Sequence, residues 1–179
     1  FEITLSNLMS TGKIDEEDFM DRAKLLCSLG QTVMISNFKE YYQLVEYFSE
    51  YTKKKIRLTM GVNNLIEIFN EKYYRHLSGG ILEAFGKLFF KNLKVYLYPI
   101  IDPKNGSIIN SSNLRVNPRI KELYNFFKYN DKVVDILDYS TDDMKIYSKD
   151  VIEQIQTGVK GWESKLPPGV SKLIKAKKL

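Results

Sequence analysis

One stretch of the chain, residues 32–60, reads TVMISNFKEYYQLVEYFSEYTKKKIRLTM. Its first five residues are a short apolar run rich in β-branched side chains, which is typical of a strand covered on both faces. The spacing of an amphipathic helix follows at four apolar positions: Tyr41, Leu44, Val45 and Phe48. Residues 56–60 then give a second strand, which ends before Gly61. A strand, a helix and a strand within about thirty residues predict a βαβ unit.

The region after this unit supplies a third strand. Residues 93–98 read LKVYLY, Pro99 follows them, and residues 81–90 repeat the helical spacing before them. Strands that are separated by helical crossovers tend to be parallel neighbours in one sheet. The strands at 32–36, 56–60 and 93–98 are therefore expected to share a single sheet.

The rest of the chain predicts mainly helices. Asp102-Pro103-Lys104-Asn105-Gly106 is a strong turn signal, and we expect a hairpin through residues 107–109 after it. Further elements are expected as follows: a helix opened by Asn117 and Pro118, a short strand at 133–137, a helix at 148–156 and a last helix after Gly169. The sequence thus predicts an α/β fold with a small, mostly parallel sheet of about three core strands, βαβ crossovers and an α-rich C-terminal extension. We expect residues 1–179 to form a single α/β domain with its core at about 14–100 and the extension at about 101–179.

The N-terminal part predicts two helices. Residues 2–9 are expected to form a short helix and residues 10–13 its turn. Asp15 is the expected N-cap of a clearer helix that carries Phe19 and Cys27 on its apolar face. We expect the Cys27 thiol to be buried, and a single cysteine cannot form an internal disulfide. A reducing compartment fits this cysteine usage best, so we expect a cytoplasmic protein.

Composition and charge exclude several classes of protein. No apolar run reaches the roughly 18 to 20 residues that cross a bilayer, so no membrane association is expected. Residues 1–10 lack the basic region and apolar stretch of a secretory signal. The first residue is phenylalanine rather than methionine, which suggests a fragment of a longer protein. The formal charge of +5 comes largely from lysines at 53–55 and 172–178, which we interpret as solvated ends rather than a nucleic-acid surface.

Residues that commonly carry chemistry are few. The chain holds one Cys and one His, whereas a structural zinc site needs four such ligands. The acidic residues at 15–18 and 142–143 lie where helices are expected to begin and complement the helix dipole. We therefore expect no metal, and the sequence identifies no cofactor. His76 as a general base and Cys27 as a nucleophile both lack an identifiable partner residue, so a structural role is the preferred interpretation of each.

The hypothesis of a ligand site rests on topology. In open parallel sheets, ligands bind beyond the carboxyl ends of the strands. Small and short polar residues follow the expected strands: Ser36, Asn37, Gly61, Asn63, Asn64 and Asp102. His76, Gly79 and Gly80 extend the candidate ligand-binding set, because the two glycines precede a helix whose N-terminus could bind an anion. Caps and turns require the same residue types, so both interpretations stay open.

Four motifs carry a resemblance to a known family. They are TVMISNFKEYY at 32–42, MGVNNL at 60–65, EKYYRHLSGGILEAFG at 71–86 and WESKLPP at 162–168. Across nearly its whole length, the chain resembles the C-terminal third of a family of large bacterial proteins often called TonB-dependent receptors and sometimes nicotinate-nucleotide adenylyltransferases. The resemblance implies that a longer N-terminal portion precedes this fragment and that the fragment ends a few residues before the usual terminus. It transfers no catalytic residue.

Three functions fit these observations. The first is an accessory or interaction α/β domain of a larger cytoplasmic bacterial protein, not a true TonB-dependent receptor. Its partners would be the missing N-terminal portion or a second copy of the chain. It would hold a partner through an aromatic surface drawn from two tyrosine-rich stretches: Tyr41, Tyr42, Tyr47, Tyr51, Tyr73 and Tyr74. The alternative is a metabolite- or nucleotide-binding enzyme domain with its site at the carboxyl strand ends; the sequence does not decide whether the protein is an enzyme. The third is a nucleic-acid-binding module that uses the basic tail, and we do not expect nucleic acid among the partners.

Overall fold

The computed structural model describes residues 1–5, 16–90 and 93–177. The chain divides into two compact units. The first unit consists of Phe1–Lys39 and Ser140–Leu179, and the second unit is Glu40–Tyr139. These boundaries differ from the expected division near residue 100. The second unit carries the larger sheet.

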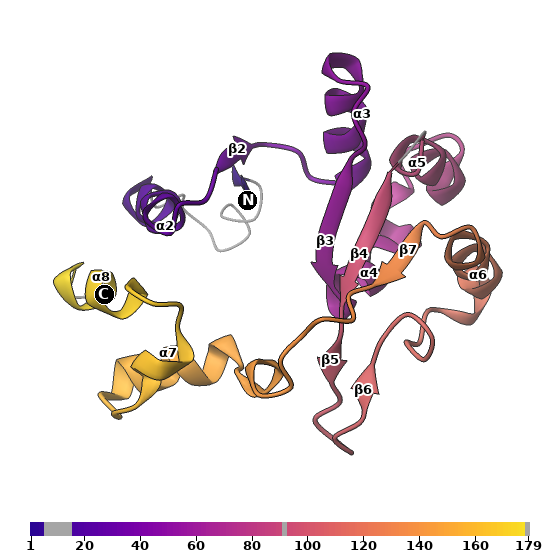
Figure 1. Cartoon of the computed structure of the whole chain (residues 1–179). Helices are drawn as coiled ribbons and strands as arrows, with labels where there is room; N and C mark the ends of the chain where they lie inside the picture. The colour runs from indigo at the N-terminus through magenta and orange to yellow at the C-terminus, as the bar shows by residue number, and fades with distance from the viewer. Residues whose placement is uncertain (6–15, 91–92, 178–179) are drawn as a thin grey trace. The chain divides into compact units, whose positions relative to one another are not determined.

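The sheet of the second unit has three parallel strands. They are β3 (Arg57–Gly61), β4 (Lys94–Tyr98) and β7 (Val133–Asp135), in the order β3-β4-β7 (Figure 1). Leu97 in the central strand is opposite Met60 on one side and Asp135 on the other. The small parallel sheet that the sequence predicts is therefore confirmed, with the strands expected at 56–60 and 93–98 as neighbours.

One expected strand lies elsewhere. The strand β2 (Met34–Ser36) pairs with β1 (Glu2–Thr4) in a separate two-stranded parallel sheet of the first unit. Ile35 is 50% exposed, so β2 is not the strand buried on both faces that its apolar run predicts. The expectation that residues 2–9 are helical is wrong at 2–4, where Ile3 pairs with Ile35 and a β-branched residue favours the strand. The weakly signalled strand β7 occupies the third position of the larger sheet.

Helices of the second unit follow the predicted pattern closely. Their bounds are α3 (Tyr41–Tyr51), α4 (Val62–Ile68), η1 (Glu71–Tyr74), α5 (Gly80–Leu88), η2 (Pro118–Ile120) and α6 (Lys121–Tyr129). The Asn117 side chain accepts a hydrogen bond from the Arg119 amide, as its predicted capping role requires. The helix α4 begins directly at Val62, after Gly61, so Asn63 and Asn64 lie inside its first turn and neither caps it.

An aromatic cluster forms the centre of this unit. Phe85 of α5 is 1% exposed, and four rings surround it at centroid distances of 4.7 to 6.0 Å: Phe69, Tyr74, Phe89 and Phe127. Val95 and Leu97 of β4 are fully buried in the same core. The rings come from η1, α5 and α6 and from the residues that end α4 and α5, so the cluster packs these helices against the buried side chains of β4.

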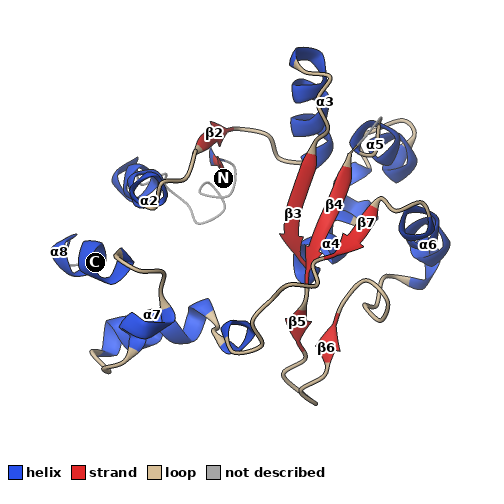
Figure 2. Ribbon diagram, in the orientation of Figure 1, coloured by secondary structure: helices blue, strands red, loops and turns tan. Residues whose placement is uncertain are grey.

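A hairpin extends the unit past the carboxyl ends of the larger sheet. Its strands β5 (Ile100–Ile101) and β6 (Ile108–Ile109) are antiparallel and lie beyond the arrowheads of β3 and β4 (Figure 2). In the turn, the Gly106 amide donates to the Asp102 carbonyl, and Gly106 adopts a φ of 72° that favours glycine. The predicted turn and hairpin are confirmed.

The first unit is mostly helical apart from the β1-β2 pair. Its helices are α2 (Glu16–Ser28), η3 (Asp143–Lys145), α7 (Ser148–Thr157), η4 (Trp162–Lys165) and α8 (Val170–Lys177). The predicted helices at 148–156 and after Gly169 are confirmed. The expected cap at Asp15 and turn at 10–13 lie outside the described residues. In the part of the chain that is described, no helix is long and apolar enough to cross a membrane.

Cys27 is exposed, so the prediction that it is buried is wrong. The helix α2 buries Phe19 and Ala23. Each further step of four residues rotates a side chain by about 40° around a helix of 3.6 residues per turn. Cys27 is two such steps from Phe19, and this rotation carries it past the edge of the buried face.

Candidate functional site

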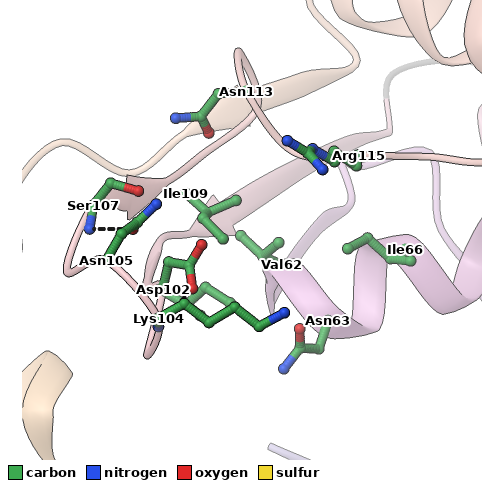
Figure 3. Close-up of a pocket in the computed structure, with 11 residues that line it drawn as sticks. Val62, Asn63, Ile66, Asp102, Lys104, Asn105, Ser107, Ile109, Asn113 and Arg115 are labelled. Atoms are coloured by element: carbon green, nitrogen blue, oxygen red, sulfur yellow. Dashed lines mark hydrogen bonds between the residues drawn. The ribbon is translucent and has the colours of Figure 1, made fainter.

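A pocket of about 540 Å³ opens at the carboxyl edge of the three-stranded sheet (Figure 3). Its lining comes from the start of α4, the β5-β6 hairpin and the loop before η2: Val62, Asn63, Ile66, Ile100, Asp102, Lys104, Asn105, Ser107, Ile109, Asn113 and Arg115. The strand β3 leads directly into α4, and β4 leads through Pro99 into the hairpin. The pocket therefore lies where the topology of a parallel sheet favours ligands.

The floor of the pocket is apolar. Val62 is fully buried, and Ile66 packs beside it one turn along α4. Ile100 and Ile109 are opposite each other in the antiparallel hairpin, so both contribute to the same surface. These four residues give the pocket a hydrophobic base with polar side chains above it.

Several polar side chains of the rim hold their own turns. The Asp102 carboxylate accepts a hydrogen bond from the Lys104 amide at 2.9 Å, and the Asn105 side chain accepts one from the Ser107 amide at 2.9 Å. Asn113 accepts from the Asn110 amide and donates to the Ile108 carbonyl. These side chains fix the loops, and only their remaining lone pairs and side-chain amide hydrogens are available to a ligand.

Three other rim side chains form no hydrogen bond within the loops. The Asn63 amide, the Lys104 ammonium and the Arg115 guanidinium form no hydrogen bond or ion pair with any residue that the structure describes. Figure 3 shows the Lys104 amine turned toward Asn63. Together these groups offer several hydrogen-bond donors and two positive charges above the apolar floor.

A buried hydrogen-bond network anchors the loop that carries Asn113 and Arg115. Ser111 donates twice to the Asp135 carboxylate, from its amide at 2.9 Å and from its hydroxyl at 2.7 Å. The buried Tyr124 hydroxyl donates to the Ser111 carbonyl at 2.6 Å, and burial raises the pKa of Tyr124 above its usual range. Asp135 is the last residue of β7, so the third strand positions the loop.

We expect Asp135→Asn to lower the free energy of unfolding by about 1–3 kcal/mol, because charge-assisted hydrogen bonds to Ser111 are weakened or lost. Urea unfolding followed by circular dichroism measures the change. Asp138→Asn is the matched control, since Asp138 is an exposed carboxylate three residues away. Equal stabilities of the two variants would show that the network does not hold the loop.

The residues expected at the strand ends are divided between the two units. Ser36 and Asn37 belong to the first unit, where the Ser36 hydroxyl donates to the Glu2 carboxylate. Gly61, Asn63 and Asn64 belong to the second unit. Asn63 lines the pocket, whereas its exposed neighbour Asn64 does not. The pocket thus contains one residue of the candidate ligand-binding set together with Asp102.

The other candidate residues lie around the start of α5. His76 Nε2 is 3.2 Å from the Tyr42 hydroxyl, so the imidazole has a structural partner. The Gly79 amide donates to the Glu83 carboxylate at 3.0 Å, and this bond, with weaker help from Lys87, lowers the pKa of Glu83. Gly80 opens α5 with a φ of 54°. The Gly79 amide expected to bind an anion is therefore already engaged by a carboxylate of its own helix.

Two other features bear on function: the metal-ligating side chains and the basic tail. Within residues 1–5, 16–90 and 93–177, no group of three or more His, Cys, Asp or Glu side chains could hold a metal ion. In the tail, Lys175 forms an ion pair of 2.6 Å with Glu163 and lies over the Trp162 ring. This lysine packs against η4 of its own unit.

Sequence reasoning did not find Lys104, Arg115 and Asp135 as functional candidates. Lys104 belongs to a turn signal and Arg115 to a loop without periodicity, so neither stands in a sequence pattern that indicates a ligand. A signal was present for Asp135, because it ends a β-branched run in the same way that Ser36 ends another.

Comparison with known proteins does not indicate a function. No family model, no curated protein and no solved structure matches this chain.

Proposed function

We propose that the second unit is a ligand-binding domain and that the pocket at the carboxyl edge of its sheet binds a small metabolite. The observation that carries this proposal is that Asn63, Lys104 and Arg115, none of them engaged by another described residue, line one pocket together with an apolar floor. Binding sites for small molecules commonly combine an apolar lining with a few polar groups that orient the ligand.

Two further features support the proposal. The volume of about 540 Å³ lies within the range of pockets that take metabolites of ordinary size. The loops that line the pocket are held by their own hydrogen bonds, from Asp102, Asn105, Asn113 and the Asp135 network. A site whose loops are already ordered loses less conformational entropy when the ligand binds.

An interaction domain is the second candidate function. Tyr47 and Tyr51 lie one turn apart on α3, are 45% and 72% exposed, and have ring centroids 4.8 Å apart. Exposed tyrosines are common in protein interfaces. Two other tyrosines of the expected aromatic surface, Tyr42 and Tyr74, are buried in the core. The exposed pair is smaller than the surface first expected, so we place ligand binding ahead of this function.

A screen with a pocket-blocking variant tests the proposal. Asn63→Trp places a large side chain at the mouth of the pocket, and Asn64→Trp places the same side chain on the adjacent exposed position outside it. Melting temperatures are measured with a library of organic acids, sugar phosphates, nucleotides and amino acids. We expect at least one compound to raise the melting temperature of the unmodified chain and of Asn64→Trp, but not of Asn63→Trp.

Two results would contradict the proposal. One is that no compound stabilises the unmodified chain. The other is that stabilisation persists in Asn63→Trp, because binding would then occur elsewhere on the protein.

A further inference from the structure

We infer that the ligand of this pocket is an organic anion, a carboxylate or a phosphate monoester, that carries an apolar body. The inference rests on the proposed ligand-binding function and names the chemical class of the ligand. It follows from the charges on the rim, from their lack of partners and from the floor beneath them.

The charge of the lining is unbalanced. Of its eleven residues, two are cationic, Lys104 and Arg115, and one is anionic, Asp102. One Asp102 oxygen accepts a hydrogen bond from the Lys104 main-chain amide, so this carboxylate is committed to the hairpin turn. Neither cationic side chain forms an ion pair with it or with any other described residue. The rim therefore presents a net positive charge to whatever enters.

The two cations come from independent, fixed loops. Lys104 lies in the turn closed by the bond from the Gly106 amide to the Asp102 carbonyl. Arg115 follows the buried Leu114 in the loop that Ser111 ties to Asp135. The backbone beneath each charge is thus held before a ligand arrives. A guanidinium on a fixed backbone is suited to bidentate hydrogen bonds with the two oxygens of a carboxylate or phosphate.

The floor specifies the rest of the ligand. Ile66, Ile100 and Ile109 are half-buried and offer no hydrogen-bonding side chain, so a fully hydrated ion such as free phosphate would leave this surface uncovered. An alkyl or aryl group would bury it with a favourable hydrophobic contribution. The same ligand would place its anionic head beside Arg115, with the charge of Lys104 on the same rim. An anion with an apolar body would therefore contact both the cationic rim and the apolar floor of the pocket.

Six probes that carry or lack a six-carbon alkyl chain and a negative charge test this inference. Their binding to the whole protein chain is measured by isothermal titration calorimetry. Hexanoate and hexyl phosphate carry both the negative charge and the apolar body. Hexanol and hexylamine lack the negative charge, and acetate and inorganic phosphate lack the apolar body. We expect hexanoate or hexyl phosphate to bind about tenfold more tightly than the other four. Hexanol and hexylamine cannot form charge-assisted hydrogen bonds through an anionic head, and acetate and inorganic phosphate leave the apolar floor uncovered. Whichever of the two binds with the lower dissociation constant shows whether the preferred head group is a carboxylate or a phosphate.

Variants locate the charge that is responsible. Arg115→Gln is expected to weaken binding of the tighter anion about tenfold and Lys104→Gln to weaken it less, because Lys104 acts as a single point charge. Arg119→Gln is the matched control: Arg119 is exposed, lies four residues from Arg115 and does not line the pocket. All three positions are on the surface, and thermal melts verify that each variant is folded.

Three results would overturn the inference. They are equal affinity for hexanol or hexylamine and the anions, equal weakening by Arg115→Gln and Arg119→Gln, and no binding by any of the probes. Hexanol or hexylamine binding that Asn63→Trp abolishes would leave the proposed ligand-binding function standing and remove only the anionic class. Failure of these probes together with failure of the metabolite screen would remove both.

Discussion

Replacement of Phe85 by alanine should lower the free energy of unfolding by about 3–5 kcal/mol, which is comparable to the whole stability of many domains. Phe85 is almost fully buried, and its ring makes edge contacts with Phe69, Tyr74, Phe89 and Phe127. The truncated side chain would leave a cavity. The four surrounding rings are themselves packed in the core, so they cannot move far enough to fill it. Urea unfolding followed by circular dichroism and tyrosine fluorescence measures the loss.

The control for this variant lies on the same helix. Leu82 of α5 is 66% exposed, so Leu82→Ala removes apolar atoms without opening a cavity, and we expect a change below about 0.5 kcal/mol. A Phe85→Ala variant no less stable than Leu82→Ala would mean that the aromatic cluster is not the centre of the core.

Alkaline pH is expected to destabilise the second unit through two buried tyrosines. Tyr74 donates its hydroxyl hydrogen to the Ile68 carbonyl at 2.7 Å, and Tyr124 donates to the Ser111 carbonyl at 2.6 Å. Burial raises the pKa of both above the value of about 10 that tyrosine has in an unfolded chain. Above that pH the unfolded state releases these protons while the folded state keeps them. The free energy of unfolding is therefore constant with respect to these groups below about pH 10 and falls as the pH rises toward their folded pKa.

Phenylalanine variants separate this effect from other alkaline titrations. In the double variant Tyr74→Phe, Tyr124→Phe, the free energy of unfolding should be lower near neutral pH, because two buried carbonyls lose their hydroxyl donors. It should then fall less steeply than that of the unmodified chain between about pH 10 and 11.5. Tyr129→Phe, at an exposed position of α6, should leave the slope unchanged. Identical slopes in the unmodified chain and the double variant would rule out the two tyrosines as the cause.

Much of the fold could be predicted because its signals are local. The helical spacing at residues 41–48, the turn at 102–106 and the Asn117-Pro118 cap each depend on neighbours within one or two turns, and all three occur in the structure. Strand partners depend on contacts between distant residues. The run at 32–36 has the composition of an interior strand, yet it pairs with residues 2–4, because composition does not encode which edge a strand joins.

The candidate site was predictable only where it follows from topology. Asn63 and Asp102 lie just past the ends of β3 and β4, so the rule for parallel sheets places them at the pocket. Arg115 reaches the same pocket from a loop whose path is set by Ser111, Tyr124 and Asp135. That path is a tertiary feature with no sequence period, so the second cation of the rim became visible only in three dimensions.

Chemical-shift mapping with hexyl phosphate tests the central claim most directly. Titration into the ¹⁵N-labelled chain reports each backbone amide separately, including those of Asn63, Lys104, Ser107 and Arg115, which surround the pocket. We predict that the largest saturable shifts occur at these amides and that Asn63→Trp abolishes them. Saturable shifts centred on the basic tail around Lys172 and Lys175, or no saturable shift at the pocket amides, would contradict an anion-binding site at the carboxyl edge of the sheet.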